Sequence, residues 1–368
     1  MLWIIGGLVV AVVIAGIIWL NTSPQFGGKH SEADIARYEA SGHYEEGVFV
    51  NLSETSMDMS LSSMWGMTQQ MLARGGNKKP EAKLVPQQLR LEDLEASQKA
   101  KVTWFGHSTM LIMLDGKTLL IDPMFGEAPA PHPMLGANRY ADELPIEIES
   151  LPHIDAILIS HDHYDHLDYG SIQRLKDKCE NFFMPLGVGA HLRAWGIPED
   201  HITEMNWWDE LDHSGLKFAL TPARHFSGRG MNNRSTTLWG GWVIHSSTER
   251  IFFSGDSGYD THFKEIGDKY GPFDLAMMEC GQYSEFWAEI HMMPEEVAQA
   301  GLDVQAKKVM PIHWGAFTMA MHSWTDPVER FVAKSEELNV NYITPEVGAM
   351  FTVSDDDYRG SAWWEGVE

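Results

Sequence analysis

The sequence predicts an α/β fold whose short buried strands deliver polar residues at their carboxyl ends. Short apolar runs that favour strands alternate with segments that favour helices. Four of the apolar runs end in histidine or aspartate, namely at the cluster 161–166, at His225, at Asp256 and at His313. Ligands of open α/β sheets bind where the carboxyl ends of strands meet. We therefore expect these residues to converge on one site.

The globular pattern of the catalytic domain begins near residue 101. An Asp-Gly pair between two apolar runs, Asp115-Gly116, favours a tight hairpin. Strands are expected at 101–105, 109–114, 118–121, 154–159, 182–185, 218–222, 238–245, 250–254, 274–278, 308–312, 342–344 and 350–353. Helices are expected at 61–72, 169–178, 188–195, 294–305 and 327–338.

The chain divides into four predicted parts. Residues 1–20 form a transmembrane anchor, and residues 21–96 form an N-terminal extension. One helical face of this extension, with Leu61, Met64, Trp65, Met71 and Leu72, is expected to pack on the main domain; the alternatives are that it lies on the membrane or leans over the mouth of the site. Residues 97–353 form the catalytic domain, and residues 354–368 form an acidic, loosely held tail.

The anchor prediction rests on the uncharged apolar run from Leu2 to Leu20. A helix of this length rises about 28 Å, close to the hydrocarbon thickness of a bilayer. Trp3 and Trp19 stand near its ends, where an interfacial aromatic belt lies. The alternative, a cleaved signal peptide, usually has basic residues before the apolar run. The predicted localisation is therefore the membrane, with a single-pass N-terminal anchor whose orientation stays open.

The charge balance is acidic, with 27 Lys and Arg against 52 Asp and Glu and a net charge of −25. Such a field repels the phosphate backbone, so no nucleic-acid partner is expected. A small anionic group held by metal ions remains compatible with this charge. The two cysteines, Cys179 and Cys280, do not form a zinc motif.

Three histidines and three aspartates fall within the nine residues from Ser160 to Asp168. The pattern H-x-H-x-D-H offers four metal donors on one short loop, of the types that bind divalent ions of borderline softness. Four donors so close together would crowd a single tetrahedral ion. Two metals are the more natural interpretation, with His161 and His163 on one ion and Asp165 and His166 on the other. The alternative is a solvated polar turn without metal.

Motifs between about residues 101 and 353 resemble the metallo-β-lactamase superfamily, in its branch near N-acylphosphatidylethanolamine-hydrolysing phospholipase D and the ascorbate-phosphate lactonases. The matching segments are 105–108, 121–125, 160–168, 221–225, 253–256, 291–296 and 313–315. The resemblance implies an αββα sandwich with two zinc ions at one edge. It further implies that one zinc is bound by His161, His163 and His225, the other by Asp165, His166 and His313, and that Asp256 bridges them.

Further residues receive expected roles near this site. His291, in the family's H-x-x-P-E-E position, is the candidate for binding a substrate phosphate or protonating the leaving group, with helix capping or packing as the alternative. Asp122 is expected to orient a ligand histidine, since fixing the tautomer of a ligating imidazole is a common carboxylate task. His107 is expected to be structural or to support a ligand. Arg224 and Arg229 are either phosphate contacts or solvated loop residues.

The predicted function is that of a membrane-anchored hydrolase with two zinc ions that activate water against a phosphodiester. The preferred substrate is a phospholipid of the N-acylphosphatidylethanolamine type, cleaved as by phospholipase D. A lactonase or another carboxylic ester or amide hydrolase is the alternative on the same fold. A nuclease is disfavoured by the acidic charge, and a non-catalytic membrane zinc protein is the alternative from a different class.

Overall fold

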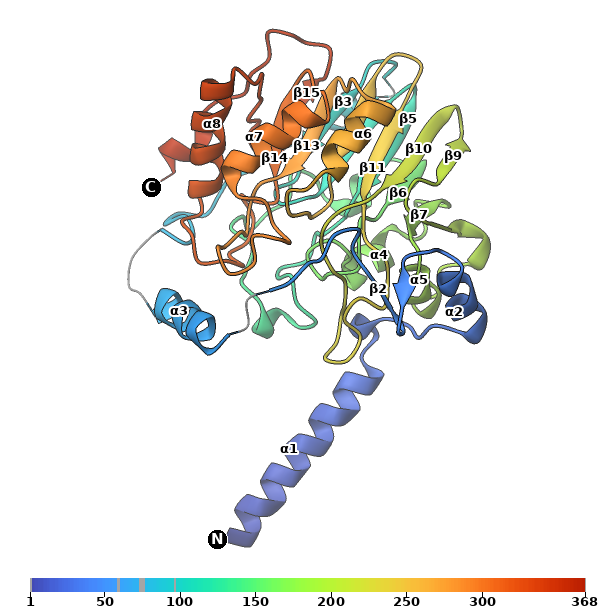
Figure 1. The fold of residues 1–368 in the computed structure, drawn as a ribbon, viewed down its shortest axis with the longest axis vertical. Coiled ribbons are helices and arrows are strands. Elements are labelled where there is room, and N and C mark those ends of the chain that lie inside the picture. Colours follow the sequence, from blue (N-terminus) through green and yellow to red (C-terminus); the bar gives the residue numbers. More distant parts are fainter. Residues whose placement is uncertain (1, 58–59, 73–76, 96, 368) are drawn as a thin grey trace.

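The computed structural model describes the whole chain except residues 1, 58–59, 73–76, 96 and 368. Two β-sheets lie face to face at its centre, and helices cover their outer faces (Figure 1). The predicted α/β class and the layered αββα arrangement are confirmed.

The first sheet has seven strands in the order β15-β3-β4-β5-β6-β7-β8. Strands β15 to β5 pair antiparallel, and β5 to β8 pair parallel. Their bounds are β3 Lys101–Trp104, β4 Met110–Leu114, β5 Lys117–Ile121, β6 Ala156–Leu158, β7 Phe182–Pro185, β8 Ile202–Met205 and β15 Met350–Thr352.

The second sheet has six strands in the order β14-β13-β12-β11-β10-β9. Strands β12, β13 and β14 are parallel to one another. Strand β11 pairs antiparallel with both β10 and β12, so β10 runs in the same direction as β12. Their bounds are β9 Glu210–His213, β10 Leu216–Thr221, β11 Gly241–His245, β12 Arg250–Phe253, β13 Leu275–Glu279 and β14 Val309–Ile312. A small hairpin, β1 Tyr44–Glu45 with β2 Val48–Phe49, lies in the N-terminal extension.

The helices flank the two sheets. Helices α4 and α5 pack against the first sheet, and α6, α7 and α8 pack against the second (Figure 1). The bounds are α1 Leu2–Thr22, α2 Glu32–Glu39, α3 Leu61–Leu72, α4 Tyr169–Leu175, α5 Gly189–Ala194, α6 His262–Tyr270, α7 Pro294–Asp303 and α8 Asp326–Leu338. Single 3-10 turns lie at Pro24–Phe26, Leu91–Leu94, Pro133–Leu135, Ile148–Ser150, Glu199–His201 and Trp363–Gly366.

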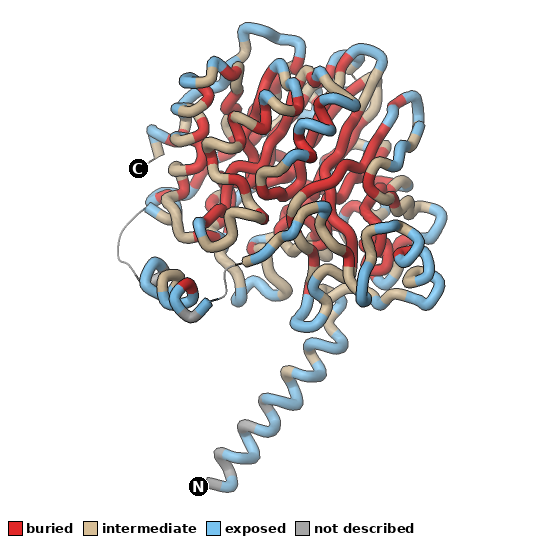
Figure 2. The backbone as a smooth tube through the Cα atoms, viewed as in Figure 1, coloured by how far each residue is buried: buried red, intermediate tan, exposed pale blue. Residues whose placement is uncertain are grey.

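The inner strands of the two sheets are mainly apolar, since both of their faces are buried. On β4, Met110 and Ile112 face the layer between the sheets, whereas Leu111 and Met113 face the helices. Strands buried on both faces are near-continuous apolar runs instead of alternating patterns. Figure 2 shows the buried segments concentrated in the two sheets. This burial makes the sheets a rigid support for the loops at their edge.

The transmembrane prediction is not supported. The run from Leu2 does form the continuous helix α1, which extends away from the rest of the chain (Figure 1). Yet within the residues described by the structure, no helix combines the length and apolarity needed to cross a membrane. The predicted membrane anchor and single-pass localisation therefore have no support in this structure.

Elements missing from the sequence prediction lack a clear apolar run. Strand β9 is the polar edge segment Glu-Leu-Asp-His, and α6 buries only part of a mostly polar sequence. Residues 342–344 form isolated bridges to Val309 and Gly360 instead of a strand. The tail is not loosely held, because Trp364 is buried and Trp363 stacks on Trp314. The extension packs on the main body through Tyr38 and Phe49, which are buried in its core.

Candidate metal centre

The strands of both sheets that share one direction deliver polar residues to one edge of the sandwich. Asp122 follows β5, His161 follows β6, and the loop after β6 continues to His166. From the second sheet come His225 after β10, Asp256 after β12 and His313 after β14. The structure thus brings together all seven predicted ligands, in two adjoining groups.

The first group contains His161, His163, His225 and Asp256, whose donor atoms lie within 4.8 Å of one another. His163 Nδ1 is 2.9 Å from His161 Nε2 and 3.2 Å from His225 Nε2. Asp256 Oδ2 lies 3.8 Å from both His161 Nε2 and His225 Nε2. Three imidazole nitrogens and one carboxylate oxygen therefore surround one point, as in a tetrahedral site.

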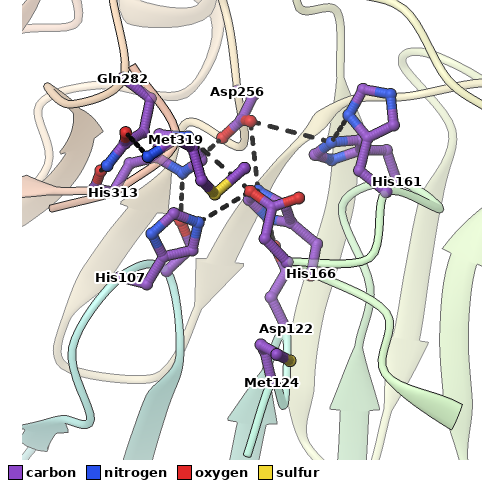
Figure 3. Close-up of polar contacts among 12 residues, drawn as sticks. His107, Asp122, Met124, His161, His166, Asp256, Gln282, His313 and Met319 are labelled. Atoms are coloured by element: carbon purple, nitrogen blue, oxygen red, sulfur yellow. Dashed lines mark hydrogen bonds and ion pairs between the residues drawn. The ribbon is translucent and has the colours of Figure 1, made fainter. Parts of the chain in front are cut away.

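The second group contains Asp165, His166 and His313, together with His107. Asp165 Oδ2 lies 3.3 Å from His166 Nε2 and 3.9 Å from His313 Nε2. Asp256 also reaches this group, since its Oδ2 is 3.1 Å from His166 Nε2 (Figure 3). Its carboxylate faces both groups, which is the position required of a bridging ligand.

Three of the ligand histidines have a further contact at their Nδ1 atom. His161 Nδ1 lies 2.9 Å from Ser160 Oγ, and His225 Nδ1 donates to the carbonyl of Ile290 at 2.9 Å. His313 Nδ1 lies 3.0 Å from Ser108 Oγ. Such contacts fix the tautomer and rotation of a ligating imidazole.

Asp122 occupies the orienting position expected from the sequence. Its Oδ2 lies 2.7 Å from His166 Nδ1, and its Oδ1 accepts the backbone N–H of Ser160 at 2.7 Å. The side chain is fully buried, and the residue has a positive φ of 43°. A non-glycine residue in this left-handed conformation persists only where its surroundings fix it. Here the strand end, Ser160 and His166 do so.

Glycine allows the loop carrying Asp256 to approach the first sheet. Gly255 has a φ of 61°, and a Cβ there would lie 2.5 Å from the carbonyl oxygen of Gly240 and 3.2 Å from the Cβ of Ser160, which follows β6 of the first sheet. No larger residue fits this approach without moving the backbone. The glycine therefore sets how close Asp256 comes to the histidines of the β6 loop.

The donor set fits divalent cations. Among the described residues, His166 Nε2, His313 Nε2 and Asp256 Oδ1 are buried without a hydrogen-bond partner. Buried polar atoms are normally satisfied, and exceptions need an explanation. Imidazole nitrogens and carboxylate oxygens that converge in this way are the ligands chosen by zinc and related metals.

The electrostatics favour a cation at the same place. Burial lowers the pKa of His161, His225 and His313, which keeps their imidazoles neutral and able to bind a metal. Burial alone would raise the pKa of Asp165 and Asp256, but nearby histidine charge, chiefly on His166, outweighs it and holds both pKa values well below the usual range. The pKa of His166 is raised above its usual value despite burial, because Asp256 and Asp165 stabilise its charge. The carboxylates of Asp165 and Asp256 thus stabilise a positive charge between the two groups, and a metal cation can take the place of the His166 proton.

His291 lies at the rim of the centre, paired with Glu279. Its Nδ1 is 3.2 Å from Glu279 Oε1, and one of its ring nitrogens lies within 4.8 Å of donor atoms of Asp256 and His313. Burial raises the pKa of Glu279 to about 7, although His291 opposes the shift. Burial lowers the pKa of His291, but the Glu279 carboxylate outweighs it, and the net shift is upward. His291 also lines the cavity described below.

The remaining predicted residues have structural contacts. His107 Nε2 lies 2.8 Å from Asp165 Oδ2, in agreement with a supporting role. Arg229 is buried, and it donates to the carbonyls of Asp162, Leu167 and Gln25. Arg224 donates to Thr55 and to the carbonyl of Glu54. Neither arginine lines the cavity described below, so the suggested phosphate contacts are not supported.

A cavity of about 380 Å³ opens directly onto the two groups. The polar part of its lining includes Asp165, Asp256, His163, His291 and His313. The apolar part, called the apolar wall below, includes Met57, Phe226, Trp287, Ile290 and Met319. The site therefore presents metal donors and an apolar surface in the same cavity.

Sequence reasoning missed Glu279 and the apolar wall. Glu279 ends β13, so the rule that singled out Asp122 and Asp256, a carboxylate at the end of an apolar strand, also applies to it. No comparable signal exists for Phe226, Trp287 and Met319. They come from separate loops and meet only in the folded chain.

The comparisons with known proteins agree with this geometry. Residues 117–314, more than half of the 368-residue chain, match the β-lactamase superfamily domain. The chain belongs to the β-lactamase superfamily, and the resemblance predicted from its motifs is confirmed.

Two individual relatives and one solved structure are similar to the chain as follows. The chain is 38% identical over 350 residues to an uncharacterised protein of Mycobacterium tuberculosis, covering 94% of this chain and 93% of the relative. It is 31% identical over 281 residues to N-acyl-phosphatidylethanolamine-hydrolyzing phospholipase D 1 of Caenorhabditis elegans, covering 72% of this chain and 79% of that protein. The crystal structure of an isothiocyanate hydrolase from Delia radicum gut bacteria has the same fold, with a TM-score of 0.55, 20% identity, and coverage of 69% of this chain and 99% of that one.

Proposed function

We propose that this protein is a hydrolase with two zinc ions that cleaves a phosphodiester, with a phospholipid of the N-acylphosphatidylethanolamine type as substrate. The observation that carries the proposal is the cavity that is lined by both donor groups and by the apolar wall. A phospholipid has the matching division between an anionic phosphodiester and apolar chains. The similarity to the worm phospholipase D supports this substrate class.

The residues of the site would have separate roles in metal binding, orientation and proton transfer. His161, His163 and His225 would hold one ion, Asp165, His166 and His313 the other, and Asp256 both. When bound, two divalent ions lower the pKa of water and polarise an oxygen of the substrate. Asp122 keeps the His166 Nε2 directed at the centre through its contact with Nδ1. His291, on the cavity wall, is the candidate for protonating the leaving oxygen.

The apolar wall gives the substrate a second point of attachment. Phe226, Trp287 and Ile290 line the same cavity as the donor groups and can exclude water from an acyl or glycerol portion. Burial of apolar surface contributes about 25 cal/mol per Å². Binding energy from this wall would hold the phosphodiester over the donors in a reactive orientation.

The direct test uses the purified, zinc-loaded chain and dispersed N-acylphosphatidylethanolamine. Mass spectrometry should detect phosphatidic acid and the free N-acylethanolamine, which are the products of phospholipase D cleavage. The metal-stripped chain should form neither product, and added zinc should restore both. Products cleaved at a carboxylic ester, or activity confined to a lactone panel, would contradict the phosphodiester proposal.

A further inference from the structure

Glu279 is a buried carboxylate beside the candidate metal centre. It ends β13, the strand between β12 and β14, which deliver Asp256 and His313. Its relative exposure is 0%, and among the described residues no lysine or arginine pairs with it. Its Oε1 lies 3.2 Å from His291 Nδ1, and its Oε2 accepts the backbone N–H of Met292 at 3.1 Å. Both oxygens thus hold the segment that carries His291.

A packing role does not explain a carboxylate at this position. Burying an ionisable group without a strong partner is costly, whereas an apolar or amide side chain of similar size fills the same space at lower cost. The strand otherwise consists of the apolar residues Leu275 to Met278. The contact with the imidazole of His291 is what distinguishes Glu279 from its neighbours on β13.

The geometry leaves one nitrogen of His291 for the cavity. With Nδ1 facing Glu279, the Nε2 atom has no hydrogen-bond partner among the described residues. The side chain is 12% exposed and lines the same cavity as Asp256 and His313. A carboxylate that accepts from Nδ1 fixes the rotation of the ring and supports a proton on Nε2.

We infer that Glu279 is a positioning residue, and that it holds His291 so that Nε2 delivers a proton to the leaving oxygen of the substrate. The inference rests on the proposed phosphodiester hydrolysis. Water supplies the hydroxyl group that joins phosphorus, and the bond between phosphorus and the leaving oxygen breaks with its electron pair on that oxygen. The leaving oxygen takes the Nε2 proton and departs as an alcohol. The remaining proton of the water returns His291 to its starting state.

Two substrates separate a proton-delivery role from a packing role. They are phosphodiesters that share one alkyl group and differ in the leaving group, which is 4-nitrophenol in one and ethanolamine in the other. A nitrophenolate departs without a proton, whereas an alkoxide needs one. A defect in proton delivery therefore lowers kcat for the ethanolamine diester selectively.

The variants are Glu279→Leu, which keeps the approximate size, and Glu279→Gln, which keeps a hydrogen-bond acceptor. For Glu279→Leu, kcat on the ethanolamine diester should fall about 100-fold or more, and kcat on the nitrophenyl diester should change less than about threefold. Glu279→Gln should retain part of the activity lost in Glu279→Leu. Glu249→Gln is the matched control, since Glu249 is also buried but bonds Ala100 N, at a distance from the site.

A second readout does not depend on activity. In the zinc-loaded wild-type chain, the ¹⁵N NMR signals of His291, assigned by comparison with His291→Gln, should show a proton on Nδ1. Glu279→Leu should alter that signal while the zinc content stays the same.

Two results would overturn the inference. An equal fall of kcat on both diesters would make Glu279 a packing residue, and an Nδ1 without a proton in the wild type would show that Glu279 does not accept a hydrogen bond from His291. The NMR measurement on the wild-type chain tests the contact between Glu279 and His291 even when a Glu279 variant fails to fold. Wild-type inactivity toward both diesters is a different outcome, because it contradicts the proposed phosphodiesterase function while the NMR signal still reports on Glu279.

Discussion

Asp122 Oδ2 lies 2.7 Å from His166 Nδ1, and His166 Nε2 lies 3.1 Å from Asp256 Oδ2. One imidazole therefore links a buried carboxylate on the first sheet to the carboxylate delivered by the second. The position of His166 depends on both sheets, so a disturbance at Asp122 should be transmitted to the metal centre.

The first prediction concerns Asp122→Asn. An amide at this position no longer holds a positive or metal-bound imidazole in the same orientation, so zinc affinity should fall about 10- to 100-fold. Titration of the metal-free chain with zinc against a competing chelator measures this affinity. Asp155→Asn is the control, since Asp155 bonds Thr118 N near the opposite end of the adjoining strand β6. Equal zinc affinity in Asp122→Asn and wild type would contradict the role of Asp122 in orienting His166.

The second prediction concerns Asp256→Asn. Because this carboxylate faces both donor groups, its neutralisation should lower the zinc content from two ions to one or fewer per chain. Hydrolysis should fall at least about 100-fold, given that each 1.4 kcal/mol of lost transition-state stabilisation costs tenfold in rate. Elemental analysis of the dialysed protein and rate assays measure the two effects. Asp260→Asn, in the same loop but paired with Arg224, should leave both unchanged. Two retained ions in Asp256→Asn would rule out the bridging role.

The third prediction concerns acid stability. His322 Nε2 accepts the N–H of Gln282 at 3.0 Å, and burial lowers the pKa of His322 to about 4. The unfolded chain, with a histidine pKa near 6.5, binds more protons between pH 6.5 and pH 4. The stability that depends on the neutral ring is therefore present above pH 6.5 and is lost as the pH falls through about 4.

Urea unfolding of the metal-free chain should show this loss, on the order of 2–3 kcal/mol between those pH values for this residue. His322→Gln removes the titrating group, so the difference from wild type should narrow as the pH falls. Parallel stability curves for the two proteins across this range would contradict the assignment.

The fourth prediction concerns the apolar wall. Trp287→Ala removes a large apolar surface from the cavity, so KM for a long-chain phospholipid should rise about tenfold. KM for a diester without acyl chains should change little. Trp208→Ala is the control, since Trp208 packs on Tyr270 outside the cavity. The same KM change for both substrates would indicate a general structural defect.

The sequence predicted the donors well because each follows an apolar strand or lies in one dense loop. His225 and His313 each lie far in the sequence from the dense loop of donors at 161–166. The apolar strand before each residue identified it as a candidate donor. The positive φ of Asp122 and His313 was not predictable, since it follows from tight turns between strand ends and loops. The division into four parts and the identity of the metals remain predictions.

Long-range contacts account for what was missed. The side chain of Asp162 points away from the two donor groups, although it lies between His161 and His163. It bonds His191 Nε2 at 3.0 Å and accepts Gly228 N at 2.7 Å. Nothing in the local pattern separates this aspartate from the donors beside it. Its role depends on helix α5 and a distant loop meeting in the fold.

Those contacts have a consequence for where the chain can be shortened. His191 Nδ1 accepts the N–H of Gly28 at 3.0 Å, and Arg229 donates to the carbonyl of Gln25 while also holding Asp162 and Leu167. Residues that follow α1 therefore belong to the framework of the loop that carries His161 to His166. Removing α1 alone leaves these bonds intact, whereas trimming through Gly28 takes away two of them and exposes the rear of the loop to water. For anyone preparing a shorter protein, the boundary therefore lies before Gln25, because a chain that begins after Gly28 lacks both contacts for a reason unrelated to α1.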